Sequence, residues 1–261
     1  MPLPKTVICD SDIGRFLLFR TMETITRSLL MSGDFEPTAR RLVAALFPDG
    51  DAVVIDAGAN IGTFTIPVAK ANPAGVVYCF EPQRIVFYQL CANIILNSLP
   101  NVTAIHAAIG NPDSFPCEID VPIVDYSTAQ NLGAISLTKK IQSEMIKKQK
   151  YKIEKLEKVD FTAIDFYFKN RKAKVDFIKI DVEGMELQVL TGASELLTQD
   201  QPVIFFESWI HATEERKNLQ RFCEEHNYST YFLQNDALAI PRKPLRSGKV
   251  ITILGNTVNI A

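Results

Sequence analysis

The stretch Asp56-Ala-Gly58-Ala-Asn60-Ile-Gly62-Thr63 decides the fold of this chain. It directly follows an apolar run of strand length that begins at Ala52, and it precedes a helical pattern. A glycine-rich turn between a strand and a helix lets a ligand approach the backbone closely. We therefore expect a ligand site at the carboxyl end of this strand.

Four further apolar runs of strand length recur along the chain, each followed by a helical pattern. Together with residues 52–57, they are residues 76–81, 102–109, 175–181 and 203–207. Strands that are almost continuously apolar are typical of a parallel sheet covered by helices on both faces. The order of strands and helices therefore predicts an α/β fold with five central parallel strands.

The regions outside these strands predict a cap and an insertion. Residues 21–31 and Pro37–Phe47 are expected helices, with Pro37 suited to a first helical turn. We interpret residues 1–50 as a cap segment packed on the core, and residues 51–261 as the main domain of a single globular unit. Residues 117–137 alternate like strands around a turn at Asn131-Leu-Gly133, which predicts an inserted β-hairpin.

The bulk composition narrows the function classes. The 261 residues carry a formal net charge of −2, which leaves no overall basic field for nucleic-acid binding. The five cysteines are scattered without a metal-binding or redox spacing, and we interpret them as free thiols of a cytoplasmic protein. No signal peptide or membrane span is expected, because charged residues interrupt the apolar stretch at Phe16–Met31.

The glycine turn favours S-adenosylmethionine over a dinucleotide as its ligand. A dinucleotide site requires Gly-x-Gly-x-x-Gly, but Asn60 and Thr63 occupy the second and third glycine positions here. Asp56 at the strand end would repel a pyrophosphate and suit the ammonium group of an amino-acid ligand. The plain alternative is that Gly58 and Gly62 serve only a tight turn and helix packing.

Other strand ends complete the predicted site. Glu81, followed by Pro82, lies 23 positions beyond Gly58, where a carboxylate can accept hydrogen bonds from ribose hydroxyls. Ala107 and Ala108 are small enough for an adenine ring to lie flat on them. Because strand ends of a parallel sheet share one edge, we expect one cleft to be surrounded by Asp56, Glu81, Ala108, Asp181 and Glu207.

At this point the sequence resembles the FkbM methyltransferases. The resemblance runs from about Phe35 to Glu207 and rests on a linked series of motifs: Asp56–Gly62, Phe80-Glu-Pro82 with Asn93 and Asn97 downstream, Ala107-Ala108, Asp176–Gly184 and Gly192-Ala193. It implies a class I methyltransferase fold, which is Rossmann-like with a seven-stranded, mostly parallel sheet whose last strand is antiparallel. It also implies S-adenosyl-L-methionine as methyl donor, and methylation of a hydroxyl on a sugar or secondary metabolite.

These arguments together give a set of expected donor-binding residues. Phe35-Glu36-Pro37 resembles a family pattern in which Glu36 closes over the donor, although a simple helix start at Pro37 explains it equally well. The expected set is Glu36, Asp56, Gly58, Ala59, Asn60, Gly62, Thr63, Glu81, Pro82, Ala107, Ala108 and Asp181.

Transfer to a neutral hydroxyl needs a group that takes its proton. We expect Asp181 or His211 in this role, because imidazole titrates near neutrality and burial can tune a strand-end carboxylate. No metal is expected. If a divalent metal does bind, the expected ligands are Asp181, Glu207 and His211, with Glu183 nearby. Trp209 is a candidate apolar wall for the acceptor, whereas Phe206 and His106 are expected in the core.

Several alternatives remain open from the sequence. Methylation of a small amine is a second enzymatic reading, and a non-catalytic S-adenosylmethionine-binding module is a third. An NAD-dependent dehydrogenase is a remote fourth reading, because this chain lacks the second and third glycines that a dinucleotide site requires. The resemblance implies a small-molecule acceptor such as a sugar. Residues 139–158 contain eight lysines against three glutamates, which would form a basic rim for an anionic conjugate. The plain interpretation of these lysines is a solvated surface element.

Overall fold

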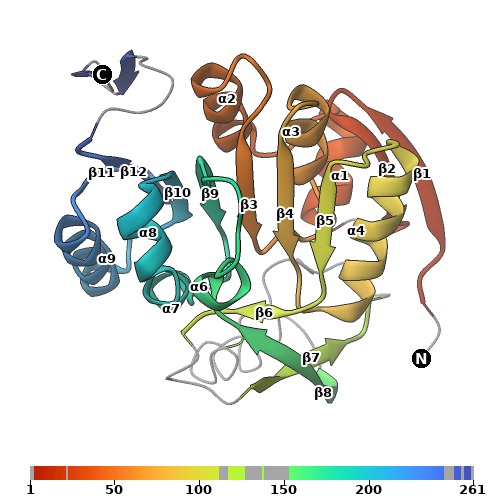
Figure 1. Ribbon diagram of the computed structural model, residues 1–261. Helices are drawn as coiled ribbons and strands as arrows, with labels where there is room; N and C mark the ends of the chain where they lie inside the picture. Colours follow the sequence, from red (N-terminus) through yellow and green to blue (C-terminus); the bar gives the residue numbers. More distant parts are fainter. Residues whose placement is uncertain are drawn as a thin grey trace.

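A seven-stranded sheet forms the centre of the molecule (Figure 1). The computed structural model describes residues 3–21, 23–111, 117–126, 137, 153–243, 250–253 and 256–259. The strand order is β11-β12-β10-β9-β3-β4-β5, and β12 is antiparallel to both of its neighbours while β10, β9, β3, β4 and β5 run parallel. The strands are β3 (Val53–Ala57), β4 (Val76–Phe80), β5 (Val102–Ile105), β9 (Phe177–Ile180), β10 (Val203–Glu207), β11 (Tyr228–Leu233) and β12 (Asp236–Pro241). This topology confirms the predicted class I methyltransferase fold.

Helices cover both faces of the sheet, as the apolar strands require. On one face, Val54, Phe177 and Phe205 pack in a core shared with α1 (Thr24–Ser32), α2 (Pro37–Leu46) and α3 (Thr65–Ala71). On the other face, Ile55 and Ile178 pack in a second core with four more helices. These are α6 (Ile164–Tyr167), α7 (Glu186–Thr191), α8 (Ser194–Asp200) and α9 (Thr213–Glu225). Phe206 is fully buried in this second core, which confirms its packing role.

The third predicted strand is interrupted. Residues 102–109 form β5 and then, after a turn at His106 and Ala107, the short strand β6 (Ala108–Ile109). β6 leaves the central sheet and joins a three-stranded sheet of order β6-β8-β7, with β7 (Glu118–Val124) and β8 (Ile153–Thr162). The sequence contained no signal for this change of sheet, because residues 102–109 are apolar on both sides of His106.

The inserted strand pair differs from the predicted hairpin. β7 pairs antiparallel with β8, so the second strand of the pair lies in the lysine-rich region that we had interpreted as a surface element. Lys158 contacts Asp120 at 3.0 Å across this pair, with both side chains about half exposed. The expected turn at Asn131-Leu-Gly133 and the lysines from Lys139 to Lys152 lie outside the described residues.

An N-terminal hairpin precedes the two predicted helices and was not foreseen. β1 (Thr6–Ser11) and β2 (Gly14–Phe19) pair antiparallel, and β2 packs against α4 (Arg84–Leu96). Asn93 of α4 accepts a hydrogen bond from the Leu17 amide at 2.6 Å and donates one to the Ile61 carbonyl at 2.8 Å. One buried side chain therefore joins the hairpin to the glycine turn. Phe16 and Leu18 of β2 are fully buried in the same core as α1, α2 and α3.

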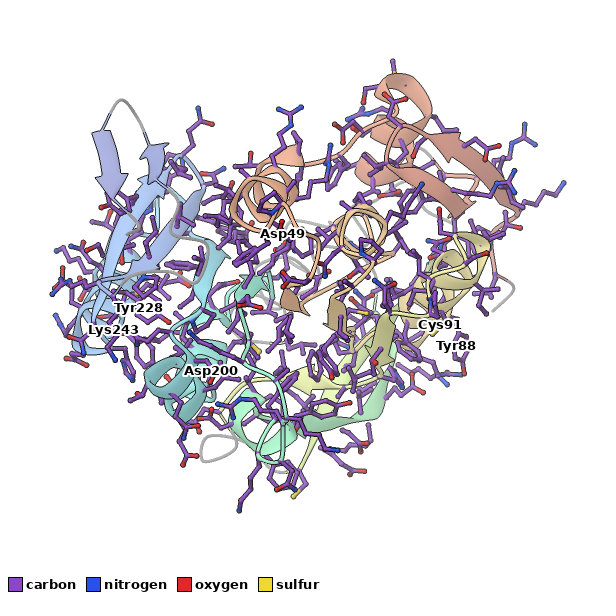
Figure 2. The ribbon with its side chains drawn as sticks, turned by 45° about the horizontal axis from the view of Figure 1, so that its top comes forward. Asp49, Tyr88, Cys91, Asp200, Tyr228 and Lys243 are labelled. Carbon is purple, nitrogen blue, oxygen red and sulfur yellow. The ribbon has the colours of Figure 1, made fainter. Side chains whose placement is uncertain are left out.

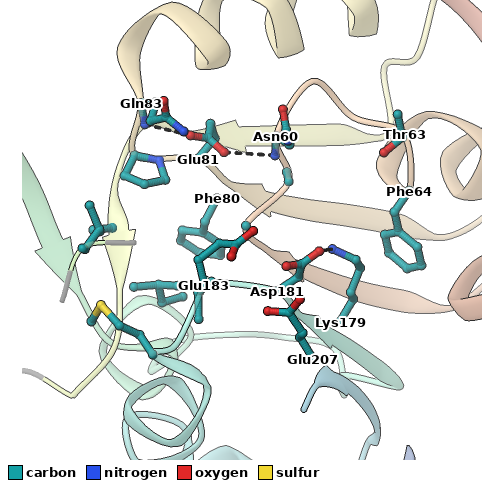
Figure 3. Close-up of a pocket in the computed structure, with 18 of the residues that line it drawn as sticks. Asn60, Thr63, Phe64, Phe80, Glu81, Gln83, Lys179, Asp181, Glu183 and Glu207 are labelled. Atoms are coloured by element: carbon teal, nitrogen blue, oxygen red, sulfur yellow. Dashed lines mark hydrogen bonds and ion pairs between the residues drawn. The ribbon is translucent and has the colours of Figure 1, made fainter. Parts of the chain in front are cut away.

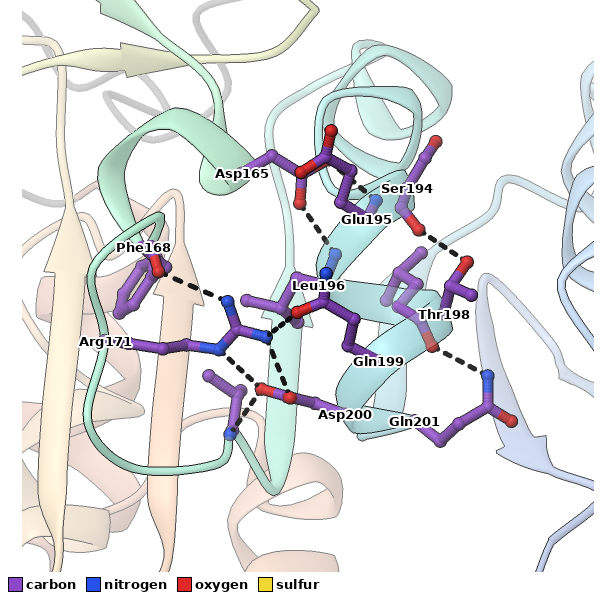
Figure 4. A network of polar contacts seen from close by, with 12 residues as sticks. Asp165, Phe168, Arg171, Ser194, Glu195, Leu196, Thr198, Gln199, Asp200 and Gln201 are labelled. Atoms are coloured by element: carbon purple, nitrogen blue, oxygen red, sulfur yellow. Dashed lines mark hydrogen bonds and ion pairs between the residues drawn. The ribbon is translucent and has the colours of Figure 1, made fainter.

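A polar network fixes the entrance to β9 (Figure 4). The Arg171 guanidinium donates to both oxygens of Asp200, at 2.9 and 2.8 Å, and Asp200 also accepts from the Val175 amide at 2.9 Å. Asp165 accepts from the amides of Glu195 and Leu196, which begin α8. These contacts hold β9 and α8 together.

In Figure 2, Asp200 and Tyr228 lie at the opposite end of the sheet from Tyr88 and Cys91 of α4.

All five cysteines are free thiols, and three of them are buried. No helix within the described ranges combines the length and the apolar character that a membrane crossing demands.

Candidate active site

One cavity opens where the carboxyl ends of β3, β4 and β9 meet (Figure 3). This is the edge at which open α/β sheets bind their ligands. We call it the first cavity. Ten of the twelve predicted donor-binding residues line it: Glu36, Gly58, Ala59, Asn60, Thr63, Glu81, Pro82, Ala107, Ala108 and Asp181. Most of the predicted donor-binding residues therefore lie together at one cavity. That they bind a donor stays a prediction.

Glu81 lies directly after β4 and is 4% exposed. Its two carboxylate oxygens accept hydrogen bonds from the amides of Asn60, at 3.0 Å, and Gln83, at 2.8 Å (Figure 3). Burial raises the pKa of Glu81 to about 7, although these two hydrogen bonds favour the ionised form. Each carboxylate oxygen can accept a further bond, so Glu81 can serve a ligand while it holds the glycine turn.

Gly58 is required by a close backbone approach. Its φ is +86°, and a Cβ atom at this position would lie 1.8 Å from the carbonyl oxygen of Asp181. This approach brings the end of β3 against the end of β9. Gly62 does not line the first cavity, and a Cβ atom on it would lie 2.9 Å from Leu90. Helix packing therefore accounts for Gly62.

Asp56 does not face the first cavity, in contrast to our expectation. The side chain is fully buried, accepts a hydrogen bond from the Thr65 hydroxyl at 2.6 Å and lies 3.6 Å from the Lys179 ammonium. Burial raises the pKa of Asp56, while Lys179 and Thr65 oppose the shift. Asp56 is thus a counter-ion of Lys179 rather than a surface for the ammonium group of a ligand.

Lys179 is the principal residue that the sequence analysis missed. Its ammonium lies 3.1 Å from Asp181 and 5.9 Å from the centre of the Phe64 ring, and its side chain is 11% exposed. Burial alone would lower the pKa of Lys179, but Asp181, Asp56 and Glu36 outweigh it and the pKa is raised. Lys179 therefore stays charged and positions Asp181 at the first cavity. A lysine inside the apolar run Phe177-Ile-Lys-Ile180 was the available signal.

Three carboxyl groups gather at the ends of β9 and β10. Asp181, Glu183 and Glu207 can each bring an oxygen within 4.8 Å of the others (Figure 3). Burial, and then the charge of Asp181, raises the pKa of Glu183 to about 8 and of Glu207 to about 9. Glu183 takes the place that we had assigned to His211 in the possible metal set. The expectation that no metal is needed stays a prediction.

His211 lies away from this cluster. The side chain is exposed in the turn after β10 and does not line the first cavity. Trp209, which is 40% exposed, does not line it either. Beyond Glu207, the Ser208 amide donates to the carbonyl of Asn235 in the turn between β11 and β12, and residues 210 and 211 form an exposed turn. Of our two candidate bases, the structure therefore brings only Asp181 to the cavity. His106 is partly buried against Phe87 rather than fully in the core.

Three residues with a strained backbone line the first cavity. Glu36, Asn60 and Glu183 adopt left-handed conformations, with φ values of 42°, 51° and 55°, although none is a glycine. All three line the cavity. Such conformations cost free energy and persist where the surrounding structure holds them, commonly at ligand sites.

The comparisons agree with this architecture. The parallel sheet with one antiparallel strand, and the cavity at its carboxyl edge, define a class I methyltransferase fold. The family described as the methyltransferase FkbM domain matches residues 56–240. The chain belongs to this family.

Individual relatives are more distant. The chain is 28% identical over 159 residues to Methyltransferase 1 of Beauveria bassiana, covering 58% of this chain and 61% of that protein. It is 24% identical over 162 residues to Methyltransferase sdnD of Sordaria araneosa, covering 54% of this chain and 60% of that protein. The chain thus spans less than two thirds of the length of these relatives. The crystal structure of methyltransferase FkbM from Methylobacillus flagellatus KT is 16% identical, with a TM-score of 0.47 over 73% of this chain and 43% of that one.

Proposed function

We propose that this chain is an S-adenosylmethionine-dependent methyltransferase that methylates a hydroxyl group of a small molecule such as a sugar or a secondary metabolite. The observation that carries the proposal is the convergence of the glycine turn, Glu81 and Asp181 on the first cavity. Membership of the FkbM family supports it.

The donor half of the site follows from the residues around β3 and β4. S-adenosylmethionine, when bound, supplies a methyl group attached to a sulfonium. Glu81 has acceptor capacity left for two ribose hydroxyls, and the small side chains of Ala107 and Ala108 leave room for a flat ring. Carboxyl groups in the lining also suit a donor that carries a sulfonium and an ammonium.

Asp181 is the proposed base. A hydroxyl must lose its proton around the transfer, so the base must be ionised at the working pH. Glu183 and Glu207, with pKa values of about 8 and 9, hold their protons at neutral pH and can donate hydrogen bonds instead. Asp181 contacts the Lys179 ammonium, which orients its carboxylate at the cavity. Alignment of the acceptor oxygen then supplies much of the rate enhancement.

The charge of the residues that line the first cavity also bears on the competing functions. Five carboxyl groups line the first cavity, at Glu36, Glu81, Asp181, Glu183 and Glu207, beside one ammonium at Lys179. This charge disfavours the pyrophosphate of NAD. Methylation of a small amine fits the same cavity, and an acceptor assay distinguishes the two. A module that binds the donor without catalysis would not need Asp181 to be held by Lys179.

Two further proposals concern the role of residues 1–50 and the cellular location of the protein. We propose that residues 1–50 cap the site, because Glu36 and Phe35 line the first cavity from that segment. We propose a cytoplasmic location, because the five free thiols suit a reducing compartment.

Calorimetric titration with S-adenosylhomocysteine tests the donor, with NAD in parallel and with EDTA present or absent. We expect micromolar affinity for S-adenosylhomocysteine, no binding of NAD and no effect of EDTA. The absence of binding to S-adenosylhomocysteine, or binding of NAD, would overturn the proposal. Mass spectrometry of acceptors incubated with S-adenosylmethionine then separates methylated oxygen from methylated nitrogen.

A further inference from the structure

A second cavity adjoins the first one and shares part of its wall. Glu36, Lys179, Asp181 and Glu207 line both cavities. The second cavity extends from this shared wall toward α2 on one side and toward the turn between β11 and β12 on the other. It therefore lies at the carboxyl ends of β9 and β10, beyond the glycine turn and Glu81.

The lining of the second cavity combines an apolar part with polar groups. Phe205 and Leu233 supply apolar surface, and Gln234, Asn235 and Asp236 supply amide and carboxyl groups. Among the described residues that line it, Lys179 is the only one with a cationic side chain, and it is already paired with Asp56 and Asp181. A small polar molecule would therefore meet hydrogen-bonding groups and an excess of carboxyls.

Two of these carboxyls face each other across neighbouring strands. Glu207 of β10 and Asp236 of β12 are directly paired in the antiparallel register, so their side chains lie on the same face of the sheet. Within the described part of the chain, no basic side chain forms an ion pair with either residue.

We propose that the second cavity is the acceptor subsite, and that it takes a small polyhydroxylated molecule carrying a protonated amine, as an amino sugar does. This inference rests on the proposed methyltransferase function and specifies its substrate class. The ammonium group lies between Glu207 and Asp236, and a hydroxyl of the same molecule reaches Asp181 in the shared wall. Charge in the lining excludes an anionic acceptor, in contrast to the anionic conjugate that the sequence suggested.

The chemistry of the carboxyls supports a cationic occupant. Burial raises the pKa of Asp236 to about 6, with a further contribution from Asp181, and Glu36 is raised to about 7 in the same way. A cation placed among these groups offsets the charge of Asp181, which adds to the effect of burial on both pKa values. An ammonium bound by carboxylates also has no free lone pair, so the methyl group goes to oxygen rather than nitrogen.

The test uses three probes of similar size and different charge. The full chain is saturated with S-adenosylhomocysteine at pH 7, and the affinities for D-glucosamine, D-glucose and D-glucuronate are measured by calorimetry or ligand-observed NMR. We expect glucosamine to bind about tenfold more tightly than glucose or better, as hydrogen bonds to charged groups allow. Glucuronate should bind more weakly than glucose.

Asp236→Asn is the decisive variant, and Asp49→Asn, at an exposed position on the loop after α2, is its matched control. Asp236→Asn should lower the affinity for glucosamine about tenfold while the affinity for S-adenosylhomocysteine and the melting temperature are retained, because Asn keeps the size of the side chain and removes only its charge. The control should leave all three values unchanged.

The outcomes separate this inference from the proposed function. Failure of S-adenosylhomocysteine to bind would overturn both. Binding of S-adenosylhomocysteine with no response to glucosamine, with equal responses to the three probes, or with an undiminished preference in Asp236→Asn would overturn the acceptor class alone.

Discussion

Replacement of Lys179 by methionine should destabilise the protein by removing the charge that faces Asp56. Asp56 is fully buried and would keep only the hydrogen bond from Thr65. Removing one partner of a buried ion pair costs about 3–5 kcal/mol. Because Asp181, the other partner, is 31% exposed and Asp56 can take up a proton, we expect about 3 kcal/mol, which lowers the melting temperature by roughly 6–12 °C.

The loss should depend on pH with a definite sign. Without the Lys179 ammonium, the pKa of Asp56 in the folded protein rises further above its ordinary value of 3.8. A carboxyl with a raised folded pKa supports the fold when it is protonated and ceases to do so as the pH rises through that pKa. The difference between Lys179→Met and the parent protein should therefore be smallest near pH 4 and grow toward pH 8.

Urea unfolding measured at several pH values checks this reasoning. Lys70→Met, at an exposed position in the last turn of α3, is the matched control and should change the unfolding free energy by less than about 0.5 kcal/mol. The double variant Asp56→Asn/Lys179→Met removes both charges and should recover at least half of the loss. A Lys179→Met protein within about 1 kcal/mol of the parent, or a double variant no more stable than the single one, would refute the assignment of Lys179 and Asp56 as a buried pair.

Three further predictions concern the site and its carboxyls. Glu81→Ala should weaken binding of S-adenosylhomocysteine by about 1.5–3 kcal/mol in calorimetry, and an unchanged affinity would remove Glu81 from the donor site. Asp181→Asn should lower kcat more than donor affinity in steady-state assays with a methylated acceptor, whereas equal losses would reassign Asp181 to donor binding. Thermal melts of the ligand-free protein should show that stability falls as the pH rises from about 5 to 9, because several buried carboxyl groups have pKa values in the folded protein above their ordinary ones. A melting temperature that rises over this range would contradict the direction of these shifts. The shifted groups are Glu36, Glu81, Glu183, Glu186, Glu207 and Asp236.

The sequence predicted the parallel core well because each central strand carries its own local signal. Residues 203–207 were predicted as a strand, and β10 has those bounds. The glycine turn and Glu81 could be placed together because parallel strands end at a common edge. These inferences need only local pattern and one general rule of sheet geometry.

The pairing of Asp56 with Lys179 could not be predicted in the same way. The two residues are direct partners in the register between β3 and β9, although 123 positions separate them in the chain. Their contact depends on β9 lying next to β3, and the sequence alone does not give the strand order. We therefore expected Asp56 to contact the ligand. Instead, its side chain lies beside a buried lysine in the protein interior.

Two other differences have local causes. His211 follows a strand end by only four positions, but it lies in an exposed turn after β10. The β1–β2 hairpin was missed because its alternation involves few residues. Phe16 and Leu18 are its fully buried side chains.

Asn93 makes the N-terminal hairpin and the glycine turn parts of one cooperative unit. Its amide group bridges Leu17, which lies 76 positions earlier in the chain, and Ile61, which lies 32 positions earlier. A local opening that separates β2 from α4 would displace Asn93, which is the hydrogen-bond partner of the Ile61 carbonyl. Ile61 follows Asn60, which lies in the cavity wall. Segments that open together exchange their amide hydrogens at similar rates. The hairpin and the turn should therefore share a common protection against hydrogen exchange, and occupation of the cavity should slow exchange in β2 as well as at the site.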